Sequence, residues 1–151
     1  MEDLDDIKMN FYIDTNIYLN FWQKEVDNRG NELWKIAFDF FNEIDKLNSP
    51  IYYSGFILRE LQFIISKSEF ELRKQIFNDM KRFHKVIALS SDYDKARKLE
   101  FLSKFQISFF DCMHIVLANK VNAILITRDK KLIDFARLYC RVNRPEEIIN
   151  Y

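Results

Sequence analysis

Short apolar runs alternate with longer segments in which apolar residues recur at helical spacing, from residue 10 to the end of the chain. The runs predict strands at residues 10–13, 51–53, 86–89 and 123–126, with a fifth candidate at 139–142. The other segments predict helices at residues 15–21, 31–47, 56–65, 70–83, 93–99, 113–117 and 130–138. Such alternation favours a parallel sheet covered by helices on both faces. We therefore expect an α/β fold, a three-layer α/β/α sandwich around a central parallel sheet of four to five strands.

The length of 151 residues suits one domain with a single core, and 48% of the residues are apolar. We expect residues 9–151 to form this domain and residues 1–8 to be a flexible extension. The extension is acidic, unlike a secretory leader, and no apolar run reaches the roughly 18–20 residues of a membrane span. The expectation is a cytoplasmic protein in which Cys112 and Cys140 are reduced thiols.

Positive and negative residues balance, with 23 Lys plus Arg and 23 Asp plus Glu. This balance argues against a protein that binds nucleic acid through a basic surface alone. It argues less against a nuclease, because acids gathered at a metal site leave the remaining surface relatively basic.

Four acidic residues stand at positions where an α/β fold presents ligands. Asp14 follows the first predicted strand, Asp129 follows the fourth, Asp111 opens a helix, and Glu60 lies early on the helix after the second strand. In an open parallel sheet, ligands bind in the crevice outside the carboxyl ends of the strands. Carboxylates gathered there repel one another unless a cation neutralises them, and Mg²⁺ suits such oxygen-rich sites. The pattern therefore predicts a Mg²⁺ site and phosphodiester chemistry.

Each of these acids also has an ordinary structural explanation. Asp14 and Asp129 sit at strand-to-helix turns, where a carboxylate caps the helix. Ser108 and Asp111 have the spacing of a capping box, and Glu60 has a basic neighbour on its own helix. The structural explanations require four unrelated acids to lie at one end of the sheet by coincidence. One shared cation explains all four positions.

Four blocks of the sequence, taken in order, resemble the motifs of PIN domains, in particular toxin ribonucleases of the VapC type. The blocks are Ile13-Asp14-Thr15-Asn16, the helix-borne Glu60, Asp111-Cys112-Met113-His114 with Ala118, and Thr127-Arg128-Asp129. The resemblance spans residues 10–149 and includes the ending Arg144-Pro145-Glu146-Glu147-Ile148. It implies a parallel sheet sandwiched by helices, and Mg²⁺- or Mn²⁺-dependent cleavage of RNA.

The resemblance also implies roles for individual residues. The acidic quartet that it implies consists of Asp14, Glu60, Asp111 and Asp129. The implied metal ligands are Asp14, Asp111 and Asp129, and Glu60 binds the metal directly or through a water molecule. Asn16 and Thr127 are the implied polar supports. Arg128, beside Asp129 in the sequence, is a candidate for holding a phosphate of the RNA substrate.

PIN toxins commonly dimerise and are silenced by an antitoxin, so the resemblance implies both a homodimer and an antitoxin partner. Aromatic residues on two predicted helices support an interface, because they span more of each helix than one core-facing stripe needs. They are Trp34, Phe38, Phe40, Phe41, Phe56 and Phe63. The alternative is that these helices bury two sides within one chain.

His114 lies three residues after Asp111, so both could face one metal from the same helix. The sequence has one other histidine, His84, and no cysteine pair that would support a zinc site. A histidine that anchors its helix through a hydrogen bond is therefore the favoured interpretation.

Three other functions remain open from the sequence. A phosphatase of the haloacid-dehalogenase type would use Asp14 as nucleophile, but its chemistry wants a second aspartate where this chain has Asn16. A catalytically idle PIN-like scaffold would bind RNA or protein. A receiver domain needs an acidic pair after the first strand, which this chain lacks.

Overall fold

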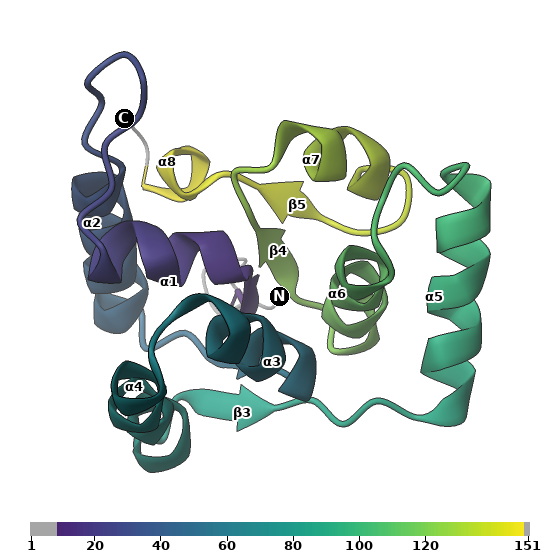
Figure 1. The fold of residues 1–151 in the computed structure, drawn as a ribbon, viewed down its shortest axis with the longest axis horizontal. Coiled ribbons are helices and arrows are strands. Elements are labelled where there is room, and N and C mark those ends of the chain that lie inside the picture. Colours follow the sequence, from purple (N-terminus) through teal and green to yellow (C-terminus); the bar gives the residue numbers. More distant parts are fainter. Residues whose placement is uncertain (1–8, 150–151) are drawn as a thin grey trace, which may run out of the picture.

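The computed structural model describes residues 9–149, and the extension expected at residues 1–8 lies outside this range. The described chain forms a five-stranded sheet with eight helices around it (Figure 1). The strands are β1 (Phe11–Ile13), β2 (Ile51–Tyr53), β3 (Phe83–Lys85), β4 (Ile124–Ile126) and β5 (Val142–Asn143). The helices are α1 (Thr15–Trp22), α2 (Leu33–Lys46), α3 (Gly55–Ile64), α4 (Lys67–Asp79), α5 (Ser90–Leu102), α6 (Phe109–Lys120), α7 (Lys130–Ala136) and α8 (Pro145–Ile148). All strand pairs are parallel, which confirms the expected α/β/α sandwich.

The strand order β3-β2-β1-β4-β5 places β1 in the centre of the sheet. Along the chain, β1, β2 and β3 follow one another toward one edge of the sheet. β4 then pairs with the other side of β1. Such a reversal is the switch point of an open α/β sheet, where ligands bind beyond the carboxyl ends of the strands. Ile13 pairs with Ile126, so the residues that follow them, Asp14 and Thr127, leave the sheet side by side.

The central strands and α6 carry the core. β1 and β4 are buried along their whole length, as expected for parallel strands between two helical layers. The ring of Phe11 meets that of Phe40 on α2 edge-on, with centroids 5.6 Å apart. Residues 112–118 of α6 are all buried, because this helix lies between the central strands and the outer helix α5 (Figure 1). This packing fixes the position of α6, and with it the start of the helix, relative to β1 and β4.

The third strand begins earlier than the sequence predicts. β3 covers Phe83–Lys85 rather than residues 86–89, and α4 ends at Asp79 rather than at residue 83. β3 is an edge strand that is only partly buried, so apolar residues do not mark its limits. The amide of Val86 still donates to the last residue of β2 before the chain leaves the sheet.

The fifth strand is shorter and later than predicted. It covers Val142–Asn143 instead of residues 139–142, because the amide of Cys140 is engaged by the carbonyl of Ala136 at the end of α7. The short helix α8 follows and was not predicted, although Pro145 suits a first helical position.

The described helices are modest in length, with α2 reaching 14 residues. Within residues 9–149, none combines the length and apolar character needed to cross a membrane. Both cysteines are free thiols, with Cys112 buried and Cys140 partly buried.

Candidate metal centre

Asp14 is fixed where β1 passes into α1. Its backbone amide donates to the carbonyl of Ile126 at 2.9 Å, which extends the pairing with β4 by one residue. Its Oδ1 caps α1 by accepting the amide of Thr15 at 2.8 Å, and its Oδ2 accepts the hydroxyl of Thr127 at 2.7 Å. Burial raises the pKa of the Asp14 carboxyl, because the charged form loses its hydration. Asp14 is thus a helix cap and a member of the acidic cluster at once.

The hydroxyl of Thr127 organises the switch point between β1 and β4. It donates to Asp14, and it accepts Nδ2 of Asn16 at 3.3 Å and the amide of Asp129 at 3.2 Å. The two predicted polar supports therefore contact each other beside Asp14. Among the described residues, the buried Oδ1 of Asn16 has no hydrogen-bond partner, which leaves an acceptor at this end of the sheet.

A chain of hydrogen bonds ties α3 to α6 through β1. His114 bonds Oε1 of Glu60 through Nε2, and its Nδ1 lies 2.8 Å from the hydroxyl of Tyr12. That hydroxyl lies 2.6 Å from the hydroxyl of Ser54. Since an ionised carboxylate can only accept, a neutral His114 donates from Nε2 and accepts at Nδ1. His114 is thus bonded through both ring nitrogens, as expected for a histidine that anchors its helix, and it orients Glu60.

Asp111 lies in the first turn of α6, where its amide donates to Oγ of Ser108 at 3.1 Å. This is half of the predicted capping box, but no hydrogen bond within residues 9–149 reaches the Asp111 carboxylate. Burial, reinforced by the negative charge of Asp14, raises the pKa of Asp111 to about 6. The Asp111 carboxylate therefore lies near the other acids and does not make the second hydrogen bond of a capping box.

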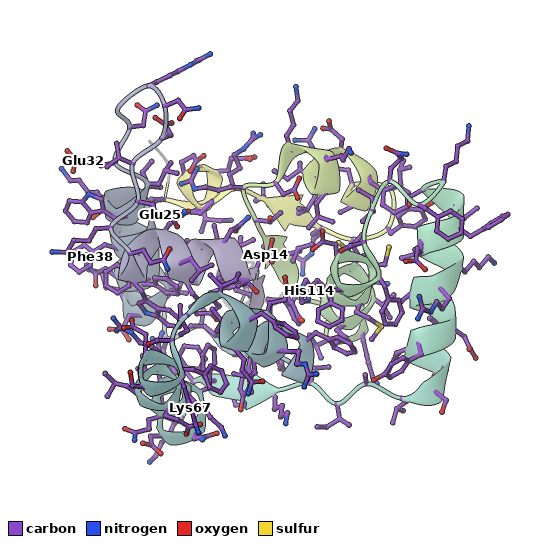
Figure 2. All side chains as sticks on the ribbon, viewed as in Figure 1. Asp14, Glu25, Glu32, Phe38, Lys67 and His114 are labelled. Atoms are coloured by element: carbon purple, nitrogen blue, oxygen red, sulfur yellow. The ribbon has the colours of Figure 1, made fainter. Side chains whose placement is uncertain are left out.

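Asp14, Glu60, Asp111 and His114 form a compact group. One ligand atom from each lies within 4.8 Å of those from the others. Asp14 and His114 meet in the middle of the molecule, between α1 and α6 (Figure 2). Three carboxylates at this spacing repel one another, and this donor set fits a hard divalent cation such as Mg²⁺ or Mn²⁺. Because both nitrogens of His114 have partners, the carboxylates are the better ligands.

The neighbouring carboxylates shift the pKa of His114. Burial disfavours the imidazolium, but the hydrogen bond and charge of Glu60, together with the charge of Asp14, raise the pKa of His114 above its ordinary value. An imidazolium at this position would offset part of the negative charge of the cluster.

Asp129 lies beside the four-residue group rather than in it. Its Oδ1 caps α7 by accepting the amide of Leu132 at 3.2 Å, and the residue is exposed. Its negative charge nevertheless contributes to the raised pKa of Asp111, so the two acids lie within electrostatic range. The structure brings three of the four predicted acids together and sets Asp129 at their edge.

Arg128 makes internal contacts. Nη1 and Nη2 donate to the two carboxylate oxygens of Glu146 on α8, at 3.0 and 2.8 Å. Nε donates to Oδ1 of Asn20 on α1 at 3.1 Å. These bonds attach the end of the chain to the first helix, and a role of Arg128 in holding substrate remains a prediction.

Replacing Tyr12 with Phe should lower the free energy of unfolding by about 1–2 kcal/mol, because Ser54 and Nδ1 of His114 lose a buried partner. Chemical denaturation measures this loss, and Tyr93→Phe is the matched control, since Tyr93 is 44% exposed. Metal affinity should fall by about 10-fold as Glu60 loses its orientation. Equal stability of the two variants would contradict the role given to Tyr12.

The fold and the acidic group together define a doubly wound α/β protein with a cluster of carboxylates at its switch point. The sequence profile of the PIN domain family matches residues 11–138. The chain therefore belongs to the PIN domain family, whose members are in general nucleases that bind divalent metal. No curated protein matches its sequence.

Solved structures share this fold at low sequence identity. VapBC-1 from nontypeable Haemophilus influenzae is 21% identical, with a TM-score of 0.63 over 91% of this chain and 98% of that one. VapBC2 from Rickettsia felis, bound to a DNA fragment from their promoter, is 20% identical, with a TM-score of 0.62 over 90% and 98%. FitAcB from Neisseria gonorrhoeae is 13% identical, with a TM-score of 0.62 over 89% and 97%. These similarities establish the PIN fold.

Proposed function

We propose that this protein is a divalent-metal-dependent endoribonuclease that cleaves RNA phosphodiester bonds with an activated water molecule. The observation that carries the proposal is the convergence of Asp14, Glu60 and Asp111 at the switch point of a PIN fold. Neutralised by a cation, these carboxylates form a site that attracts phosphate instead of repelling it.

The residues of the site have distinct tasks in this proposal. Asp14 and Asp111 hold the metal, with Glu60 as a third ligand oriented by His114. Asp129 would act on the site from its edge, through its negative charge. When bound, Mg²⁺ or Mn²⁺ lowers the pKa of a coordinated water and offsets charge on the phosphate oxygens. Thr127 fixes the position of Asp14. Because water is the nucleophile, the reaction requires no covalent intermediate between protein and substrate.

We also propose that the protein is a cytoplasmic toxin with an antitoxin partner, and that it forms a homodimer. The similarity to the VapBC and FitAcB structures supports the partner. The predicted interface aromatics are not all enclosed: Phe40 is buried, whereas Phe38 is 43% exposed. Phe38, at the outer side of α2 in Figure 2, borders a pocket of about 300 Å³ that also includes Tyr18 and Trp22. This pocket offers a place for an apolar side chain of a partner.

Incubating the purified protein with RNA tests the proposed activity. We expect cleavage of single-stranded RNA with Mg²⁺ or Mn²⁺, and none with EDTA, because the proposed mechanism depends on a metal to lower the pKa of the attacking water. Absence of cleavage combined with measurable metal binding would favour an idle scaffold. A trapped phosphoaspartate at Asp14 would instead favour the phosphatase, although Asn16 stands where its second aspartate is needed.

A further inference from the structure

An aromatic groove adjoins the metal centre. Its volume is about 390 Å³, and it lies between the second half of α3 and the start of α6. The residues that line it are Glu60, Phe63, Ile64, Ser108, Phe109 and Phe110. Glu60 belongs to both the groove and the acidic group, so the groove opens directly beside the proposed metal.

The groove has an exposed ring on one wall and a packed ring on the other. Phe63 is 74% exposed, so its ring contributes little to the core of the protein. A large aromatic side chain is usually buried, and its exposure here therefore needs another explanation. On the other wall, the ring of Phe110 is held edge-on by Phe56, with centroids 5.1 Å apart. One wall therefore presents an open ring and the other a ring fixed by packing.

A positive charge accompanies the exposed ring. The guanidinium of Arg59 lies over Phe63, with Cζ 5.2 Å from the ring centroid. Arg59 does not line the groove itself, but its guanidinium lies beside the groove because it rests on the ring of Phe63. An aromatic face with a neighbouring cation is the combination with which proteins bind single-stranded nucleic acid, by stacking on bases and by contact with phosphates.

We propose that this groove binds an unpaired RNA base next to the scissile phosphate, with Phe63 as the stacking residue and Arg59 beside the adjoining phosphate. The inference rests on the proposed ribonuclease function and assigns its substrate-positioning surface. A base inside a duplex has both faces stacked and cannot enter, so the groove selects single-stranded RNA.

The composition of the groove favours RNA over a second copy of this chain. The cores of homodimer interfaces are depleted in charged residues. Here a carboxylate lies at one end of the groove and a guanidinium over its most exposed ring. In a symmetric dimer, Arg59 of one copy could pair only with a Glu60 that already bonds His114 and belongs to the metal-binding group, so burial would desolvate the guanidinium without a free carboxylate to offset the cost.

The test uses short single-stranded oligoribonucleotides that carry the fluorescent base 2-aminopurine at each position in turn. Ca²⁺ replaces Mg²⁺ so that binding is observed without cleavage. We expect fluorescence to be quenched by stacking at one position. Phe63→Ala should abolish this quenching and weaken binding by about 5- to 150-fold, the value of one stacked base. Phe63→Tyr should retain both effects.

Phe101→Ala is the matched control, since Phe101 is 69% exposed on α5 and does not line the groove. Equal binding and quenching by Phe63→Ala and Phe101→Ala would overturn the inference, as would quenching at no position. A dimer in light scattering that dissociates only with Phe63→Ala would assign the groove to a second copy and also overturn it. Quenching without cleavage in Mg²⁺ would reject the proposed nuclease activity and retain the groove as an RNA site.

Discussion

Asp14→Asn should lower the rate of RNA cleavage by about 10³-fold, whereas Asp129→Asn should lower it by only about 10- to 100-fold. Asp14 lies within the four-residue group, and loss of its charge removes metal-mediated stabilisation worth several kcal/mol. The Asp129 carboxylate caps α7 from the edge of the group, where residues that act on a metal through another group have smaller effects.

Single-turnover cleavage of a labelled oligoribonucleotide at saturating Mn²⁺ measures both variants against the wild type. Asparagine is as good a helix cap as aspartate, so both variants should keep their helices, which circular dichroism checks. Equal losses for the two variants would place Asp129 among the direct ligands, as the sequence resemblance implies. An active Asp14→Asn variant would remove the basis for the metal centre.

The central part of the fold could be predicted from the sequence because burial leaves a clear pattern there. β1, β2 and β4 are short apolar runs within the core, and their predicted positions agree with the structure to within a residue. β3 and β5 form the two edges of the sheet, where fewer residues are buried. Apolar periodicity therefore misplaced both edge strands by about three residues, the usual uncertainty of such boundaries.

The site could be predicted in part for the same reason. Asp14 and Thr127 follow buried strands that pair in parallel, so their contact depends on strand order alone. The hydrogen bond between Glu60 and His114 depends on how α3 packs against α6. No local sequence pattern indicates this packing. Ser54 illustrates the limit, because it stands at the cap position of α3 but bonds Tyr12 instead of the helix.

Asp129 shows how one residue can fit two patterns. It has the position of a site acid after β4 and the position of a cap for α7, and sequence spacing cannot separate these roles. In the structure its carboxylate is turned toward the amide of Leu132. Asp14 satisfies both roles because Thr127 directs its second oxygen, whereas Asp129 lacks a corresponding partner among the described residues.

Without metal, the Asp111→Asn variant should be more stable than the wild type at neutral pH, and the difference should vanish near pH 4. The pKa of Asp111 is raised from 3.8 to about 6 in the folded protein. A raised folded pKa means that the protonated carboxyl stabilises the fold fully below the unfolded pKa, and that this contribution is lost as the pH rises through the folded pKa. The wild type should therefore lose about 1–3 kcal/mol between pH 4 and 7 that the asparagine variant keeps.

Urea denaturation in EDTA across this pH range measures the difference, with Asp94→Asn, an exposed change on α5, as the control that should show none. Adding Mn²⁺ at about 100 times its dissociation constant should reverse the order at pH 7, since binding to the native state alone stabilises it by about 2.7 kcal/mol. The variant has lost a ligand and should gain less. The same carboxylates around Asp14 then have two effects. They destabilise the metal-free fold by repelling one another, and they stabilise the fold when they bind Mn²⁺. The metal site would be contradicted if the stability of the wild type changed with neither pH nor Mn²⁺ and Asp111→Asn were no more stable than the wild type.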